Sequence, residues 1–147
     1  MDIRTLNFDE LDARTAYDVW RLRQDVFVVE QECAYPDLDG RDTEPGTRHL
    51  VGRLDGAVAG YVRVLDADGE EPRVGRVVLA RAARGRGLAD PLMRTALEVV
   101  GARPSVLDAQ APLAGWYAGF GYVADGPEFL EDGIPHLRMV RPGGPQM

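Results

Sequence analysis

The chain has 147 residues, 45% of them hydrophobic, and a formal net charge of −7 at pH 7. This length fits one domain, so we expect a single domain over residues 1–147 that buries a core of its own. The negative charge argues against nucleic acid as a partner and is compatible with a cationic substrate.

Several residue types are rare or absent, and each absence excludes a class of protein. All 17 basic residues are arginine, so Schiff-base chemistry and a Walker-type phosphate loop are excluded. Ser105 is the only serine and lies in no G-x-S-x-G elbow, which argues against a serine hydrolase. Cys33 is the only cysteine, so no internal disulfide can form. With no apolar run near the ~20 residues that span a bilayer and no signal-peptide stretch, we expect a cytoplasmic protein without a membrane partner.

The first third of the chain predicts a strand, a helix and a long loop. Residues 3–8 have the pattern of a short strand. Thr15 and Asp18 form a capping-box pattern, and apolar residues recur at helical spacing up to Val29, so we predict a helix from Thr15 to about Val29. Residues 30–48, EQECAYPDLDGRDTEPGTR, are polar and broken by proline and glycine. We expect an irregular loop there, and loops this long are often functional or mobile.

Six strands and two helices are predicted in the remainder. Asp55-Gly56 is a strong signal for a two-residue hairpin between the strands expected at residues 49–54 and 57–65. The other elements are a strand at 73–80, a helix up to Gly101, a strand at 105–109, a short helix at 112–120, and strands at 122–123 and 134–140 around a loop at 125–133. Early hairpins followed by strand–helix–strand units predict a mixed α/β sheet.

Residues 81–92, RAARGRGLADPL, are expected to connect a strand to the start of a helix. Gly85 and Gly87 allow backbone dihedrals closed to other residues and let a ligand come close. The first amides of a helix lack internal partners, and the helix dipole adds positive charge, so phosphate or pyrophosphate is the usual ligand of such a turn. Arg84 and Arg86 add full charges. On these residues alone a surface turn is an equal alternative, and the spacing is not that of the nicotinamide fingerprint.

The segment Arg84-Gly85-Arg86-Gly87-Leu88-Ala89 resembles the Q/R-x-x-G-x-G/A signature of the GNAT superfamily, the acetyl-CoA-dependent N-acetyltransferases. The segment WYAGFGY, residues 116–122, is similar to the Y-x-x-x-G-F/Y element of the same superfamily. Three longer segments resemble its ElaA-like branch: VFVVEQECAYPDLDGRDTEPGTRHL, DAQAPLAGWYAGFGY and EDGIPHLRM. The resemblance extends from Trp20 to Met139.

This resemblance implies a mixed sheet that is splayed between its fourth and fifth strands, with helices on both faces and acetyl-CoA in the splay. It places the pantetheine arm along Val77, Val78 and Leu79, with the Val77 amide at the thioester carbonyl. The pyrophosphate is expected at the amides of residues 84–89. The alternative is that these three residues are ordinary sheet core. Both interpretations can hold, because the backbone edge would bind the ligand while the side chains pack in the core.

The resemblance also implies that Tyr117 is the acid that protonates the departing thiolate, with a packed aromatic residue as the alternative. An amine of pKa ~10.4 is mostly protonated at pH 7, so attack on the thioester needs a base. Many GNAT proteins carry a glutamate on strand four for this purpose, but Arg73 stands at that position here. His49 and His136 are candidates for the base or for acceptor binding. Structural histidines and a water relay are the alternatives.

The loop after the first helix commonly holds the acceptor in this superfamily. Here it is strongly acidic, and the following residues form either a solvated surface or an acidic mouth for a cationic amine: Glu30, Glu32, Asp37, Asp39 and Asp42. The spacing of its aspartates does not fit a calcium loop, and no spacing of Cys33 with the histidines supports zinc, so we expect no metal.

We therefore expect acetyl-CoA and an unidentified primary amine as substrates. An idle CoA-binding or regulatory module and an acyltransferase for longer acyl-CoA are the alternatives. The sequence leaves the oligomeric state open, with a homodimer as one option.

Overall fold

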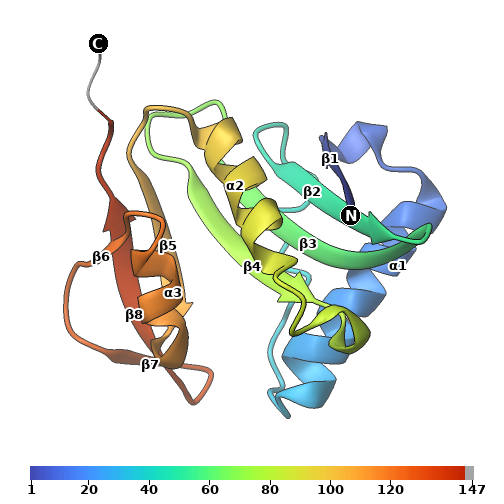
Figure 1. Cartoon of the computed structure of the whole chain (residues 1–147). Coiled ribbons are helices and arrows are strands. Elements are labelled where there is room, and N and C mark those ends of the chain that lie inside the picture. Colours follow the sequence, from blue (N-terminus) through green and yellow to red (C-terminus); the bar gives the residue numbers. More distant parts are fainter. Residues whose placement is uncertain (145–147) are drawn as a thin grey trace.

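A computed structural model describes residues 1–144 of the chain (Figure 1). Within that range, eight strands form one sheet in the order β1-β2-β3-β4-β5-β8-β6, and β7 also pairs with β8. The strands are β1 (Asp2–Leu6), β2 (Arg48–Leu54), β3 (Ala57–Leu65), β4 (Arg73–Leu79), β5 (Ser105–Gln110), β6 (Val123–Ala124), β7 (Phe129–Glu131) and β8 (Ile134–Arg141). Only β4 and β5 are parallel in this sheet, so the predicted mixed α/β architecture is confirmed.

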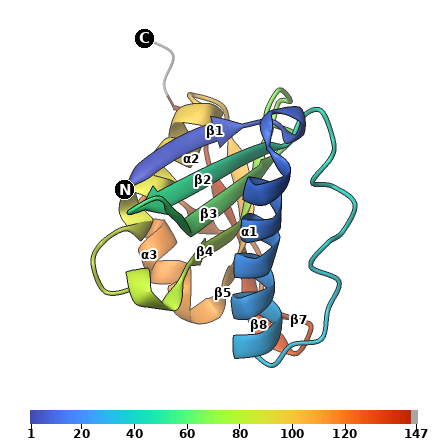
Figure 2. The ribbon, with the colours of Figure 1, turned by 90° about the vertical axis from the view of Figure 1, so that its right-hand side faces the viewer.

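Helices cover both faces of the sheet, as predicted (Figures 1 and 2). On one face, α1 (Ala13–Arg23) buries Val19 and Leu22 against Tyr61 of β3 and Val78 of β4. On the other face, α2 (Ala89–Val100) buries its apolar stripe against β2 and β3. The short α3 (Ala114–Ala118) follows β5 and lies on the same side as α2 (Figure 2). No helix among residues 1–144 is long and apolar enough to cross a membrane.

The first helix begins two residues earlier than predicted. The carboxylate of Asp12 accepts a hydrogen bond from the amide of Thr15 (2.7 Å), so Asp12 is the N-cap and the assignment of Thr15 to that position was wrong. Thr15 is instead buried, and its hydroxyl accepts a hydrogen bond from Arg53. Beyond Arg23 the chain continues as a π-helix, residues Gln24–Glu30, so the predicted end near Val29 holds although the last turns are wider than an α-helix.

The segment from residue 31 to 47 is the irregular loop that was expected, and in Figure 2 it runs beside α1. The loop predicted at residues 125–133 is only partly irregular, because β7 lies within it and pairs with β8. Asp132 and Gly133 both have positive φ (51° and 78°) and connect the two strands in the same way as Asp55-Gly56 connects β2 and β3.

Strands β4 and β5 pair at a single position, Arg73 opposite Val106, and then separate. This is the splay between the fourth and fifth strands that the family resemblance implies, and Figure 1 shows the two strands diverging toward their C-terminal ends.

Candidate functional site

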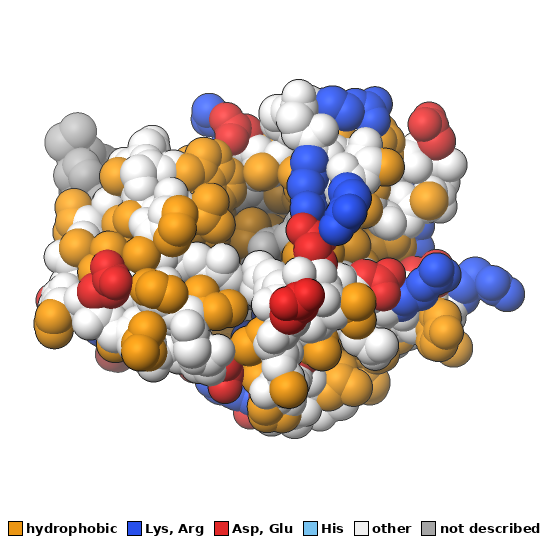
Figure 3. Space-filling view, turned by 90° about the horizontal axis from the view of Figure 1, so that it is seen from below, with side chains coloured by type: hydrophobic (Ala, Val, Ile, Leu, Met, Phe, Trp, Pro, Cys, Tyr) orange, Lys and Arg blue, Asp and Glu red, His pale blue; other side chains and the backbone are white. Residues whose placement is uncertain are grey.

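A cavity of about 640 Å³ lies where β4 and β5 diverge. One wall is formed by residues 73–79 of β4, and the opposite wall by Leu107, Asp108 and Gln110 of β5 with Tyr117 of α3. The loop after α1 and the β7–β8 hairpin close it from behind, and it reaches Arg84 in the glycine-rich turn. Figure 3, seen from the end where β4 and β5 stop, shows a recess between the two parts of the molecule with arginine side chains beside it.

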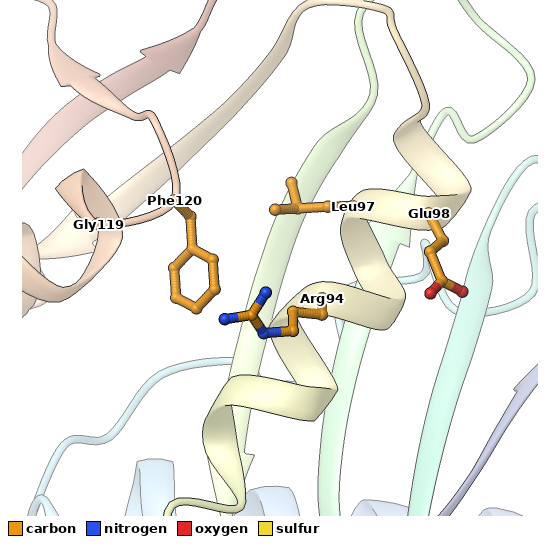
Figure 4. A pocket seen from close by; sticks show the side chains of 5 residues that line it. All are labelled: Arg94, Leu97, Glu98, Gly119 and Phe120. Carbon is orange, nitrogen blue, oxygen red and sulfur yellow. The ribbon is translucent and has the colours of Figure 1, made fainter.

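A second hollow of about 480 Å³ lies on the outer surface between α2 and α3 (Figure 4). There the guanidinium of Arg94 lies over the ring of Phe120, 6.0 Å from its centroid, while Glu98 points away from both. None of the predicted catalytic, cofactor-binding or acceptor-binding residues lines this hollow. The cavity between β4 and β5 is therefore the candidate site.

Strand β4 is irregular where it borders the cavity. Gly75 pairs with Arg63 and Val78 pairs with Tyr61, so Arg76 and Val77 together face the single residue Val62 of β3. This is a β-bulge, and Arg76 has a positive φ of 50°. The side chain of Val78 packs toward α1, whereas Val77 and Leu79 contact the core on the other face. All three residues line the cavity, so the predicted pantetheine edge is at the site.

The glycine-rich turn has the backbone geometry that its sequence predicts. Gly85 and Gly87 have positive φ (75° and 71°), and a Cβ at either position would meet nothing within 4 Å. The α-helix that follows begins at Ala89. Arg86 is exposed, and no ion-pair partner for it occurs among residues 1–144. The turn is thus open at both glycines and carries one unpaired cation, whereas the amide of Arg84 already donates to the carbonyl of Arg81 (3.3 Å).

Arg84 differs from Arg86 because it is already paired. Its guanidinium donates to both carboxylate oxygens of Glu30 (2.7 and 2.9 Å) and to the carbonyl of Leu79 (3.2 Å). The hydrogen bond from Arg84 lowers the pKa of Glu30, which is a partner of the turn rather than a free acidic group. The ion pair between Arg84 and Glu30 therefore connects the glycine-rich turn to the end of the π-helical segment.

Tyr117 is buried (7% exposed), and it lines the cavity. Burial raises the pKa of its hydroxyl above the usual value near 10, so the group keeps its proton at neutral pH. Its ring packs against Trp116 and Tyr122, yet no side-chain hydrogen bond to its hydroxyl occurs among residues 1–144. By contrast, the hydroxyl of Tyr122 is hydrogen-bonded to Ser105 (2.7 Å), as expected of a structural residue.

The two histidines have different surroundings. His49 is fully buried, with one ring nitrogen bonded to the hydroxyl of Tyr61 and the other to the carbonyl of Asp42. Burial lowers the pKa of His49, and the residue does not line the cavity, so its position fits the structural alternative. His136 lines the cavity, and its Nδ1 lies 2.7 Å from the carbonyl of Ile134. A carbonyl only accepts, so Nδ1 donates to it, and Nε2 lies 3.7 Å from Oε2 of Glu131.

The acidic loop is largely neutralised by arginines. Asp37 and Asp42 are buried and both pair with Arg23, which is itself 0% exposed (2.9 and 2.7 Å). Asp39 pairs with Arg63 (2.8 Å). Burial alone would raise the pKa of Asp39, but hydrogen bonds from Arg63 and from the amide of Arg41 hold it below the usual range. The burial of Asp37 and Asp42 contradicts the alternative of a solvated acidic surface for these two residues.

The sequence did not single out Arg23, Arg63 or Arg76. Arg23 lies four residues after Val19, on the buried face of α1, and this position was the available signal. The carboxylates that do remain unpaired by arginine at the cavity are Glu131 and Asp132, on the β7–β8 hairpin. In the described range 1–144, no three histidine, cysteine or carboxylate side chains are placed to hold a metal ion.

The family model of the acetyltransferase (GNAT) domain matches residues 23–141. A UPF0039 protein of Mycobacterium tuberculosis is 49% identical, with 94% of this chain and 91% of that protein covered. Protein ElaA of Escherichia coli is 39% identical, with 92% and 93% covered.

Two solved structures have the same fold over nearly the whole chain. An acyl-CoA N-acyltransferase from Pseudomonas aeruginosa is 38% identical with a TM-score of 0.90, and 96% of this chain and 99% of that chain are covered. The crystal structure of Escherichia coli ElaA has the same TM-score at 35% identity and the same coverage. The chain therefore belongs to the GNAT acetyltransferase family, with ElaA among its homologues.

Proposed function

We propose that this protein is an N-acetyltransferase that transfers the acetyl group of acetyl-CoA to a primary amine by direct attack on the thioester. The observation that carries the proposal is the cavity between β4 and β5. It joins a bulged strand edge, a buried tyrosine with a free hydroxyl, and an open glycine-rich turn. A GNAT domain over most of the chain supports the same class of reaction.

Acetyl-CoA would lie along β4. The two amides of pantetheine can pair with the backbone at Val77, Val78 and Leu79 as an added strand does, and the Val77 amide would meet the thioester carbonyl. The pyrophosphate would take the amides of residues 84–89, where no side chain stands in its way at Gly85 and Gly87.

A short acyl group suits the closed end of the splay. Arg73 and Asp108 form an ion pair across β4 and β5 (3.0 Å) and both line the cavity. A long apolar chain extending toward that end would have to lie against these charges, which costs free energy. This favours acetyl over longer acyl groups.

The proposed proton carriers are Tyr117 as the acid and His136 as the base. Val77 and Gln110 each lie four residues beyond the pair Arg73–Val106 in parallel strands, and Gln110 pairs with His136. The three residues are therefore at a similar level along the sheet, with Val77 across the splay from Gln110 and His136. With Nδ1 held by the carbonyl of Ile134, Nε2 of His136 can take the proton of the attacking amine.

The acceptor would enter between the loop after α1 and the β7–β8 hairpin, which form the rear of the cavity. Glu131 and Asp132 are then the carboxylates available to a cationic amine, because Asp37 and Asp42 already pair with Arg23. Asp39 also borders the cavity but is held by Arg63. With its single cysteine, Cys33, as a free thiol, we place this activity in the cytoplasm.

Release of free thiol from acetyl-CoA in the presence of a panel of primary amines tests the proposal, with mass spectrometry to identify the acetylated product. Butyryl-CoA and octanoyl-CoA in the same assay test the preference for acetyl. Binding of CoA without turnover on any amine would favour the alternative of an idle CoA-binding module. The presence of Arg73 where many GNAT proteins carry a glutamate base supports that alternative. Faster transfer from octanoyl-CoA would contradict the acetyl assignment.

A further inference from the structure

The bulge in β4 has an unusual residue at its strained position. When the first residue of a β-bulge adopts the left-handed conformation, it is usually glycine, because a Cβ is disfavoured there. Here that residue is Arg76, with φ of 50°. Glycine is available next to it, at position 75, yet Gly75 pairs regularly with Arg63. Something other than backbone preference must therefore hold Arg76 in this conformation.

The side chain of Arg76 is anchored in the loop between residues 31 and 47. Its Nε lies 2.9 Å from Oδ1 of Asp37, an ion pair in which the N–H is not directed at the oxygen. Its Nη2 donates to the carbonyl of Asp37 (3.2 Å) and to Oδ2 of Asp39 (3.4 Å). The guanidinium also lies over the ring of Tyr35, 5.5 Å from its centroid. All of these partners belong to one loop.

The anchor itself is firmly held. Arg23 donates to the side chain and to the carbonyl of Asp37 (2.9 and 2.8 Å), and the hydroxyl of Tyr35 donates to its other carboxylate oxygen (2.6 Å). Asp37 is 7% exposed. The loop thus presents a buried, satisfied carboxylate at a fixed place, and the side chain of Arg76 must reach it from β4.

We infer that Arg76 is a positioning residue. Its side chain, anchored by Asp37 and Asp39, holds the β4 bulge open and so keeps the backbone amide of Val77 turned toward the cavity. The inference rests on the proposed function, in which that amide meets the thioester carbonyl. Its consequence is that the loop that forms the acceptor side of the cavity also sets the hydrogen-bond donor that polarises the acyl group.

Two substitutions at one position separate this role from others. In Arg76→Ala the anchor is lost while the Cβ remains, so the residue should leave the left-handed region and the Val77 amide should turn. In Arg76→Gly the anchor is also lost, but glycine adopts positive φ freely, so the bulge should persist. Arg138→Ala is the matched control, because Arg138 is also a strand arginine held in an ion pair, but it pairs with Asp125 rather than with the loop and does not line the cavity.

The measurement is the ¹H–¹⁵N signal of the Val77 amide, recorded for the free protein and in titrations with CoA and with acetyl-CoA. In the parent, Arg76→Gly and Arg138→Ala proteins, acetyl-CoA should move this signal further than CoA does. In Arg76→Ala that difference should vanish, and acetyl-CoA should bind about fivefold more weakly, the worth of one hydrogen bond. Affinity for CoA itself should stay within about twofold, since its other contacts remain.

An Arg76→Ala protein with the parent's response would overturn the inference, as would an Arg76→Gly protein that behaves like Arg76→Ala. If Arg76→Ala does not fold, Asp39→Asn serves instead, because it weakens the anchor and keeps the size of the side chain. It should shift the Val77 signal of the free protein in a measurable way, and an unchanged signal would count against the anchor. If the parent binds no CoA, the proposed function fails, while the Val77 signal of the free variants still tests the anchor.

Discussion

Replacement of Arg23 by methionine should destabilise the fold by about 3–5 kcal/mol, the usual cost of breaking a buried ion pair on one side. Arg23 is 0% exposed and donates four hydrogen bonds to Asp37 and Asp42, at 2.9, 2.7, 2.8 and 3.3 Å. Methionine replaces the aliphatic stem of arginine but has no donors, so the two carboxylates would stay buried with fewer partners. Their desolvation, rather than the loss of packing, is the main cost.

Arg21 provides the matched control in the same helix. Its pair with Asp25 spans 3.8 Å, and the two side chains are 70% and 58% exposed. Arg21→Met should therefore change the free energy of unfolding by no more than about 0.5 kcal/mol. Urea unfolding at neutral pH, followed by circular dichroism, measures both variants. Equal losses for Arg23→Met and Arg21→Met would refute the reasoning, because burial would then make no difference to the worth of the pair.

Four further outcomes are expected. Tyr117→Phe should lower turnover at least about tenfold with little change in acetyl-CoA binding, since general acids contribute about 10²–10⁴-fold; near-normal turnover with rate-limiting chemistry would exclude the assignment. Gly87→Glu should abolish CoA binding in calorimetry, whereas Gly56→Glu, with positive φ and open space like Gly87, should bind normally. Glu131→Gln should raise the Michaelis constant for a doubly charged amine at low salt and less so at high salt; no change would exclude this carboxylate from acceptor binding. Hydrogen bonds and ion pairs with arginines hold the pKa of Asp39 below its value in the unfolded chain. This carboxylate therefore stabilises the fold above about pH 4, and the stabilisation is lost as the pH falls. Asp39→Asn should accordingly make the free energy of unfolding less dependent on pH in the acid range.

The elements that the sequence predicted well are those with local causes. Asp55-Gly56 specifies its hairpin because both residues must adopt positive φ, and the glycine-rich turn takes its shape from Gly85 and Gly87 in the same way. The two errors in secondary structure also have local causes. Asp12 and Thr15 compete for the same helix start, and the carboxylate of Asp12 reaches the free amide first. The hairpin signal Asp132-Gly133 was present in the sequence, but β7 has only three residues, all exposed, and shows no alternation.

The arginine network could not be predicted, because its causes are not local. The loop after α1 looks acidic in sequence, and its neutralising partners come from three other elements: Arg23 from the first helix, Arg63 from β3 and Arg76 from β4. Hydrogen bonds between these arginines and the loop span 14 to 39 residues of the chain. Only the folded sheet brings them together, so a count of charges in one segment misjudges the field at the site.

The absence of lysine has a chemical consequence at the cavity wall. Five cationic side chains border the space proposed for a thioester, and every one is a guanidinium: Arg41, Arg63, Arg73, Arg76 and Arg84. An ammonium group loses its proton often enough to become a nucleophile, whereas a guanidinium stays protonated throughout the neutral pH range. The wall can therefore hold positive charge beside an activated acyl group without itself being acylated. A lysine introduced at Arg73 would bring a competing amine to the site, and the protein would then be expected to modify its own chain.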